Sequence, residues 1–179
     1  MNPPREHSGA ELLWPAIGTI LFVVTVPGTV VGYIPYALSH WQVQPPLFGS
    51  ILTRWSGVVL FVGGLPIFID FVVRFVRDGI GTPAPIAPTQ HLVVTGCFRY
   101  VRNPGYIAVL SMLLGQGLFF ASPAVLGYAA CVALAFHLFV LLYEEPTLRR
   151  QFGAEYKAYC RRVARWIPHR PSSAASSKS

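Results

Sequence analysis

Residues 103–148 read NPGYIAVLSMLLGQGLFFASPAVLGYAACVALAFHLFVLLYEEPTL, and Glu144 and Glu145 are the only acidic or basic residues among them, histidine aside. A bilayer core takes about 20 apolar residues per helical span, so this stretch is long enough for two spans. The Ser122-Pro123 pair near its middle indicates a tight turn. The stretch therefore predicts two antiparallel membrane helices, over residues 105–121 and 124–143.

The rest of the 179-residue chain has the same character. Hydrophobic residues make up 53% of it and charged residues 12%, whereas a soluble domain carries about 25% charged residues. The mean hydropathy is +0.50. Residues 12–36 and 55–75 predict two further spans. This composition excludes a water-soluble globule, a disordered chain and a disulfide-stapled secreted domain, and it predicts an all-α integral membrane protein with about four transmembrane helices.

The basic residues indicate how these helices are oriented. From Glu144 onward there are eight Lys or Arg residues against three acidic ones, and four arginines flank the segment between the second and third spans: Arg74, Arg77, Arg99 and Arg102. Basic residues gather on the cytoplasmic side of membrane proteins. We therefore expect both regions, and both termini of this multi-pass chain, to be cytoplasmic, with the basic residues facing lipid headgroups and not nucleic acid.

Neither a cleaved leader nor a disulfide is expected. Residues 12–36 are too long for the apolar core of a signal peptide. The cysteines, Cys97, Cys131 and Cys160, follow no metal-binding spacing, and each would face the reducing cytoplasm or lie within a span. No metal site is predicted.

An irregular segment separates the second and third spans. Five glycines and prolines between residues 79 and 88 exclude a regular helix or a central strand there, and long irregular segments in compact proteins are usually functional. We divide the chain into residues 1–77 with two membrane helices, a core over residues 78–168, and a disordered Ser- and Ala-rich tail over residues 169–179.

The adjacent carboxylates of Glu144 and Glu145 are costly next to hydrocarbon, because two like charges lose water together. Cationic partners from Arg99, Arg102 or Arg162, or a bound cation, would offset this cost. A plain helix-end pair facing water fits the spacing equally well. After the pair, apolar residues recur at helical spacing between Arg and Lys, which predicts an interfacial amphipathic helix, with Gly153 as a break between the last span and that helix.

Three single features have simple structural interpretations. Asp70 and Arg74 predict an ion pair within one helix, and His137 predicts a hydrogen-bonded residue of the bundle. For Gly115-Gln116-Gly117 we favour close helix packing.

Three motifs in order resemble one family. Residues 92–106, LVVTGCFRYVRNPGY, resemble the signature LVTxGPYRYVRHPxY. EEPTL at residues 144–148, FGAEY at 152–156 and Tyr159 resemble EExxLxxxFGxEYxxY, and VARWIP at 163–168 resembles VPRxIP. Over residues 79–168 the chain is thus similar to the isoprenylcysteine carboxyl methyltransferase family, with the phospholipid N-methyltransferases as relatives.

The resemblance implies a site for S-adenosylmethionine (SAM) that faces the cytoplasm, with the C-terminal amphipathic helix capping it. Carried over by position, the cofactor contacts fall on Gln90, His91, Leu92, Val93, Phe98, Arg102, Asn103, Pro104, Gly105 and Glu144. The catalytic roles fall on Glu145 and Arg162. Residues 78–168 would then be the methyltransferase core, and the GxG that related enzymes use for cofactor is the alternative interpretation of residues 115–117.

The chain departs from the family pattern at three places. Asn103 stands for the usual His, and Cys97-Phe98 for the usual Pro-Tyr. The arginine that faces substrate in the prenylcysteine enzymes is Val140 here, so a prenylcysteine carboxylate would lack that partner.

The resulting hypothesis is an integral membrane, SAM-dependent methyltransferase acting on a lipophilic acceptor with a carboxylate, amine or hydroxyl. Its expected partners are the bilayer and that acceptor, without nucleic acid, and the sequence leaves the oligomeric state open. Two alternatives remain: an NADPH-dependent membrane reductase of the sterol-reductase type, and a non-catalytic membrane scaffold.

Overall fold

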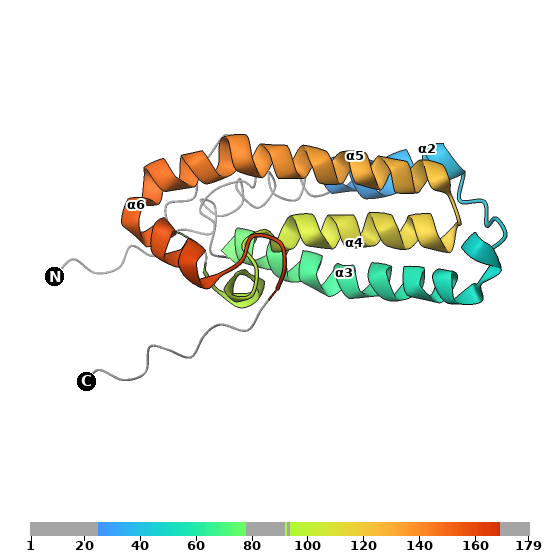
Figure 1. The fold of residues 1–179 in the computed structure, drawn as a ribbon, viewed down its shortest axis with the longest axis horizontal. Coiled ribbons are helices and arrows are strands. Elements are labelled where there is room, and N and C mark those ends of the chain that lie inside the picture. The colour runs from blue at the N-terminus through green and yellow to red at the C-terminus, as the bar shows by residue number, and fades with distance from the viewer. Residues whose placement is uncertain (1–24, 78–91, 93, 169–179) are drawn as a thin grey trace, which may run out of the picture.

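The computed structural model describes residues 25–77, 92 and 94–168, which form a bundle of helices (Figure 1). In chain order these are η1 (Gly28–Tyr33), α2 (Ile34–Ser39), η2 (Leu47–Gly49), α3 (Ile51–Arg77), η3 (Gly96–Arg99), α4 (Pro104–Phe119), α5 (Pro123–Phe139), η4 (Val140–Glu144) and α6 (Glu145–Arg162). The described residues contain no β-strand, only an isolated parallel bridge between Val101 and Ala164. The all-α prediction is therefore confirmed for this part of the chain.

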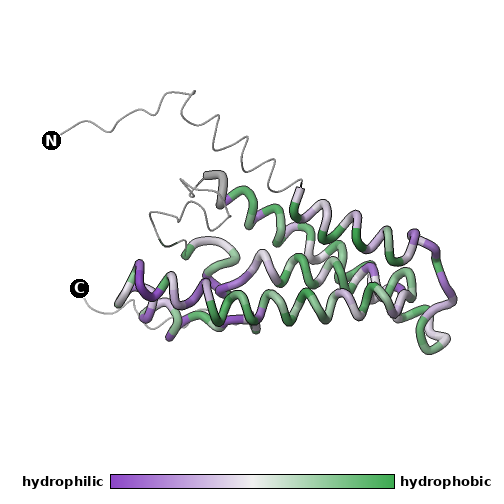
Figure 2. The backbone as a smooth tube through the Cα atoms, turned by 90° about the horizontal axis from the view of Figure 1, so that it is seen from above, coloured by the Kyte–Doolittle hydropathy of each residue, from purple (hydrophilic) through white to green (hydrophobic). Residues whose placement is uncertain are grey.

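Two helices are long and apolar enough to cross a membrane, over Ile51–Arg74 and over the continuous run Pro123–Arg162. Only 11% and 17% of their most apolar windows are buried inside the protein, so their apolar sides point outward, as in helices that lipid surrounds. Hydrophobic residues follow the length of the bundle, and hydrophilic residues gather mainly at its α6 end and in the loop after α2 (Figure 2).

The number of spans is only partly settled by these helices. The predicted spans 55–75 and 124–143 coincide with the two membrane-length helices, and the predicted span 105–121 is the shorter apolar helix α4. Residues 12–24 of the remaining predicted span lie outside the described residues. The structure thus confirms a helical protein with two membrane-length helices and a shorter apolar one, and four spans stay a prediction.

Local chemistry explains where the helices turn. The Ser122 side chain caps α5 by accepting a hydrogen bond from the Val125 backbone N–H at 3.4 Å, and Pro123 occupies the first turn, where its missing N–H costs nothing. This confirms the predicted turn. Gly153 interrupts α6 with φ +48°, a left-handed conformation that favours glycine. The predicted break is therefore confirmed, and beyond it α6 folds back across the end of the bundle (Figure 1).

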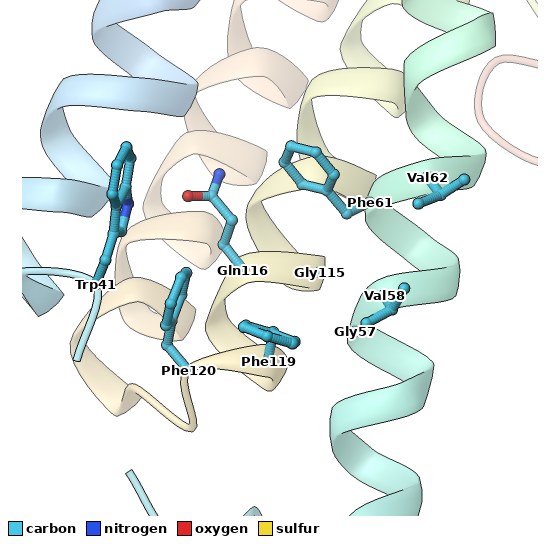
Figure 3. Close-up of a pocket in the computed structure, with 9 residues that line it drawn as sticks. All are labelled: Trp41, Gly57, Val58, Phe61, Val62, Gly115, Gln116, Phe119 and Phe120. Carbon is cyan, nitrogen blue, oxygen red and sulfur yellow. The ribbon is translucent and has the colours of Figure 1, made fainter. Parts of the chain in front are cut away.

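Small residues hold α3 against α4. A Cβ atom on Gly57 would lie 2.6 Å from the Gly115 carbonyl oxygen, and one on Gly115 would lie 2.7 Å from that of Gly57. Figure 3 shows the two glycines on neighbouring helices. The Ser111 hydroxyl donates to the Leu60 carbonyl at 2.8 Å in the same contact. Backbones approach this closely in lipid only where side chains are small.

All three residues of the Gly115-Gln116-Gly117 motif contact neighbouring helices. Gly115 contacts α3, the amide of Gln116 donates to the Val31 carbonyl at 2.8 Å, and a Cβ on Gly117 would lie 2.5 Å from a methyl group of Leu126. These contacts lie in the second half of α4, away from η3 and the start of that helix. The packing interpretation is therefore the one that the structure supports.

We expect Gly57→Ala to destabilise the protein by about 1–3 kcal/mol, because the new methyl group overlaps backbone atoms of α4. Gly63→Ala in the same helix is the matched control. Nothing lies within 4 Å of a Cβ at Gly63, so better helix propensity should leave stability unchanged or raise it by up to about 1 kcal/mol. Thermal unfolding in detergent measures both, and equal effects of the two variants would contradict the close contact.

Candidate functional site

Three segments that are far apart in the sequence meet at the α6 end of the bundle. The backbone N–H of Arg102 donates to the Ala164 carbonyl at 2.9 Å, and the Asn103 side chain donates to the Arg165 carbonyl at 3.1 Å. The hydroxyl of Tyr159 donates to the Phe98 carbonyl at 2.7 Å. The three motifs found in the sequence, at residues 92–106, 144–159 and 163–168, therefore form one site.

Glu145 lies at the centre of this site and is 4% exposed. Its carboxylate receives Arg102 Nη1 at 3.0 Å and Arg149 Nη2 at 3.2 Å. Arg165 binds both oxygens, with Nε at 2.6 Å and Nη2 at 3.0 Å. We call Glu145, Arg102, Arg149 and Arg165 the ion cluster. Of the partners that the sequence suggested, only Arg102 belongs to it.

The ion cluster compensates a charge that burial would otherwise make unstable. A buried carboxylate loses its hydration and is tolerated when charged hydrogen bonds replace that water. Three guanidinium groups do so here, and the fork of Arg165 fits the two oxygens in the bidentate geometry. The hydrogen bonds that the Arg165 guanidinium donates to Glu145 raise its pKa above its already high ordinary value, so this cation stays charged at every accessible pH.

Glu144 has a different environment from its neighbour. It is half-buried, and its Oε2 accepts a hydrogen bond from the Tyr106 hydroxyl at 3.0 Å. The two adjacent carboxylates therefore point to separate sets of partners, one to arginines and one to a tyrosine. The interpretation of the pair as two carboxylates facing water is wrong for Glu145.

Two cavities meet beside Glu144. The first, which we call the inner cavity, has a volume of about 120 Å³ and lies between η3, η4 and α6. Its lining residues are Leu92, Phe98, Arg102, Asn103, Val140, Glu144, Glu145, Leu148, Tyr156 and Tyr159. The second, the lateral cavity, has a volume of about 200 Å³ and extends between η1, α3, α4 and α5. Phe98, Arg102, Asn103 and Glu144 line both.

Arg102, which lines both cavities, carries a hydrogen-bond donor that the described part of the chain leaves unsatisfied. Its side chain is 13% exposed, and its Nη1 binds Glu145 and contacts the Cys160 sulfur at 2.9 Å. Its buried Nε has no hydrogen-bond partner among the described residues. A buried charged donor without a partner is costly, so the arrangement favours an anionic or carbonyl oxygen at this point.

The structure brings most of the predicted cofactor residues together. Leu92, Phe98, Arg102, Asn103 and Glu144 line the inner cavity, and Pro104 and Gly105 line the lateral one. Gln90, His91 and Val93 lie outside the described residues. The roles assigned to all of these residues stay predictions.

The two residues predicted to be catalytic differ in position. Glu145 lines the inner cavity, although its carboxylate is engaged by the ion cluster. Arg162 is exposed on α6, is not among the residues lining either cavity, and donates through Nε to the Ala158 carbonyl at 3.4 Å. Sequence reasoning missed Arg165, which occupies the position expected of Arg162, as well as Tyr106 and Tyr156. Arg165 lies within the closing motif at residues 163–168, and that motif was the available signal.

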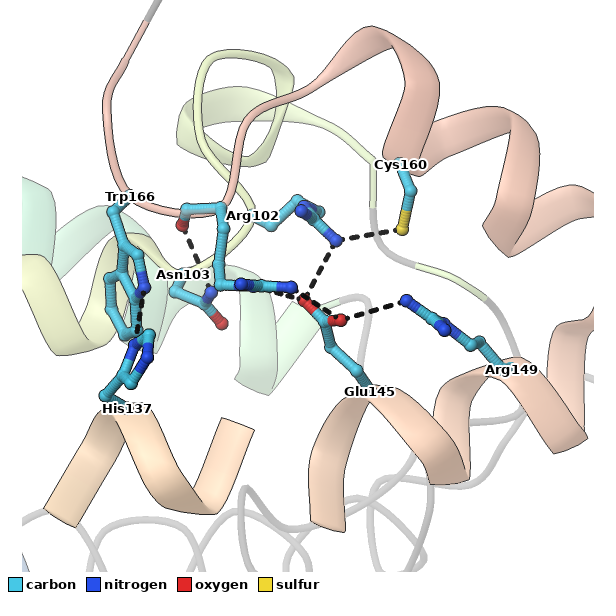
Figure 4. A network of polar contacts seen from close by, with 8 residues as sticks. Arg102, Asn103, His137, Glu145, Arg149, Cys160 and Trp166 are labelled. Carbon is cyan, nitrogen blue, oxygen red and sulfur yellow. Dashed lines mark hydrogen bonds and ion pairs between the residues drawn. The ribbon is translucent and has the colours of Figure 1, made fainter. Parts of the chain in front are cut away.

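Two further groups of contacts fix the walls of the site. Arg74 binds Asp70 at 2.9 Å, as predicted, and also donates to the Thr95 hydroxyl at 3.0 Å, while the backbone N–H of Cys97 donates to Asp70 at 3.2 Å. This pair thereby anchors η3 to α3. At the other wall, the Trp166 indole donates to His137 Nδ1 at 3.2 Å and fastens residues 163–168 to α5 (Figure 4).

This site belongs to a helical membrane protein in which a folded-back C-terminal helix covers a cavity. A family model described as phospholipid methyltransferase matches residues 52–155. Two proteins named "Probable protein-S-isoprenylcysteine O-methyltransferase", from Oryza sativa subsp. indica and subsp. japonica, are each 32% identical over 140 residues, which cover 74% of this chain and 72% of theirs. No solved structure matches.

The chain belongs to the phospholipid methyltransferase family. The resemblance inferred from the three motifs is thereby confirmed, and the protein is a membrane methyltransferase of this type. This membership favours methyl transfer over the two alternatives, a reductase and a scaffold.

Glu145→Gln should destabilise the protein by about 2–4 kcal/mol, because it removes the counter-charge of Arg102, whose side chain is 13% exposed, and of the partly exposed Arg165. Glu155→Gln is the control, since Glu155 is exposed on the same helix, and it should change stability by no more than about 0.5 kcal/mol. Chemical unfolding in detergent, followed by circular dichroism, measures both. Equal stability of the two variants would show that the ion cluster contributes nothing.

Cys97 should react slowly with alkylating agents. Burial, and then the neighbouring Asp70 carboxylate, raise the pKa of the Cys97 thiol from 9.0 to about 11. Because the thiolate is the reactive form, alkylation at pH 8 should be about a hundredfold slower than for an unperturbed thiol and should rise until the pH passes about 11. Iodoacetamide labelling of a Cys131→Ala, Cys160→Ala variant tests this, and a rate equal to that of free glutathione would contradict it.

Proposed function

We propose that the protein transfers a methyl group from SAM to a lipophilic acceptor, with the carboxylate end of the cofactor reaching the inner cavity and the acceptor in the lateral one. The observation that carries this proposal is Arg102, which lines both cavities and whose buried Nε has no hydrogen-bond partner among the described residues. The carboxylate of SAM has the charge and the acceptor atoms that this donor lacks. The donor set of the site therefore fits the cofactor.

Each lining residue has a role that follows from its chemistry. Arg102 binds the cofactor carboxylate, and Glu144, held by Tyr106, accepts hydrogen bonds from an ammonium group or ribose hydroxyls. Bound SAM supplies a methyl group on a sulfonium, which is an electrophile. The rings of Tyr156 and Tyr159 exclude water, so that the chain contributes mainly alignment. Glu145 acts as a positioning residue, because it holds the guanidinium of Arg102 in place.

The lateral cavity supports a lipophilic acceptor. Apart from the junction residues it is lined by apolar and aromatic side chains, among them Val30, Phe68, Val109 and Phe136, and by Tyr106. Val140, 1% exposed and on the wall of the inner cavity, offers no charge where the prenylcysteine enzymes have an arginine. An acceptor that reacts through an amine or hydroxyl is therefore favoured over a prenylcysteine carboxylate.

We place this end of the bundle at the cytoplasmic membrane surface. Among the described residues it carries Arg99, Arg102 and the arginines of α6 and of residues 163–168, whereas the opposite end carries Arg54. The difference follows the rule that basic residues stay in the cytoplasm. SAM, a cytoplasmic metabolite in this scheme, would enter from water and the acceptor from the bilayer.

Arg102→Gln should weaken SAM binding about tenfold or more, because a charge-assisted hydrogen bond contributes about 1.5–3 kcal/mol. Glu144→Gln should weaken it by a similar factor. Arg161→Gln, on the exposed face of α6, is the control and should bind like the wild type. Isothermal titration calorimetry on detergent-purified protein measures all four. Absence of SAM binding to the wild type, or stabilisation by NADPH instead, would overturn the proposal.

Measurements of turnover distinguish the roles of Arg162 and Arg165. With methyl-tritiated SAM and membrane lipid extract, Arg165→Gln should lower methyl incorporation at least tenfold, because it disrupts the ion cluster around Arg102. A comparable loss in Arg162→Gln would support the predicted catalytic role of that residue. Unchanged incorporation would assign the role to Arg165 alone.

A further inference from the structure

A third cavity lies at the opposite end of the bundle, and we call it the far cavity. It has a volume of about 380 Å³. Its lining residues are Trp41 from the loop after α2, Gly57, Val58, Phe61 and Val62 from α3, and Gly115, Gln116, Phe119 and Phe120 from α4 and its end (Figure 3). The one amide among them, on Gln116, already donates to the Val31 carbonyl. A lining this apolar fits a hydrocarbon chain better than a water-soluble ligand.

The packing of the helices explains why this space stays open. The paired glycines hold α3 directly against α4. The segment η1 is held against α5 and α4. The Val30 carbonyl accepts a hydrogen bond from the Tyr128 hydroxyl of α5 at 3.2 Å, and the Val31 carbonyl accepts one from the Gln116 amide of α4. Trp41 and α3 therefore stand apart across the surface of α4. Within a bilayer no hydrophobic force closes such a gap, since lipid chains are as apolar as the side chains.

Arg54 supplies a positive charge next to the far cavity. Its Nε donates to the Phe119 carbonyl at 3.2 Å and its Nη2 to the Gln44 carbonyl at 2.6 Å. Its guanidinium lies 6.0 Å from the centre of the Phe119 ring, which lines the cavity. Among the described residues no salt bridge includes Arg54, and the sequence has no acidic residue between Glu11 and Asp70. Carbonyl groups compensate only part of a full charge.

The surrounding aromatic residues place this charge at headgroup depth. Trp41 is 53% exposed and Trp55 is 62% exposed, and exposed tryptophans mark the boundary between membrane and water. Phe61 follows Arg54 on α3 and lies about 10 Å deeper, at 1.5 Å per residue. A phosphate at Arg54 and a chain in the far cavity are therefore within the reach of one lipid molecule.

We propose that the far cavity binds an anionic phospholipid, with its phosphate on Arg54 and one acyl chain between Trp41 and α3. Charge complementarity selects the headgroup, because the site offers a cation with no acidic partner among the described residues. The apolar lining and its volume select a lipid over a free phosphate. This site is separate from the methyl-transfer site and does not depend on it.

Native mass spectrometry of delipidated protein in detergent tests the proposal, with phosphatidylglycerol and phosphatidylcholine of identical chains as probes. The wild type should bind phosphatidylglycerol about fivefold more tightly, the difference expected for one basic residue at an anionic headgroup. Arg54→Gln should bring the two lipids to parity, and Arg54→Lys should keep most of the preference. Arg150→Gln, an exposed arginine of α6, is the control and should behave like the wild type.

Two further measurements distinguish binding of a whole lipid from binding of its phosphate headgroup alone. Glycerol 3-phosphate in large excess should fail to displace phosphatidylglycerol, because it has no chain for the cavity. Val58→Trp should fill the cavity and weaken the binding of both lipids. Equal binding of the two lipids to the wild type, an unchanged preference in Arg54→Gln, displacement by glycerol 3-phosphate, or unaltered binding in Val58→Trp would each overturn the proposal. If Arg54→Gln does not fold, the Val58→Trp result and the competition decide.

Discussion

The buried carboxylate of Glu145 imposes a constraint on the whole α6 end of the protein. Because hydrophobic surroundings cannot hold this charge alone, arginines from three places must converge on it: Arg102 before α4, Arg149 one turn further along α6, and Arg165 after α6. Among these arginines, Arg102 also lines the inner cavity beside Glu145. The same ion pairs that stabilise this region therefore also prepare it to bind an anionic ligand.

The chain must fold back on itself for this convergence to occur. The left-handed conformation at Gly153 redirects α6, and the segment after it then lies beside residues 101–103 through the Arg102–Ala164 hydrogen bond. The Trp166–His137 contact fastens its end to α5. A lipid-facing bundle alone would have no covered site. The part of α6 after Gly153 and residues 163–168 provide that cover, which a simple membrane anchor would not need.

Much of the site could be predicted from the sequence, because its residues lie in motifs with fixed local spacing. The motifs located Phe98, Arg102 and Glu144 on the wall of the cavity. They identified Arg102 as a partner of Glu145 but missed Arg165. Arg162 continues the helical spacing of α6, whereas Arg165 lies beyond its end, in extended backbone that begins at Val163. Helical periodicity gives no information about a side chain that lies past the last turn.

The sequence by itself determined the helices, their turn at Ser122-Pro123 and the family, since each depends on residues that are neighbours in the chain. Only the tertiary structure decided which arginines meet Glu145, that Glu144 binds Tyr106 instead, and where the cavities lie. Apart from the pair of Glu145 with Arg149 four residues on, those contacts join residues that are 20 to 43 positions apart. Their distances follow from how the helices pack and from the direction that α6 takes after Gly153, which no local pattern encodes.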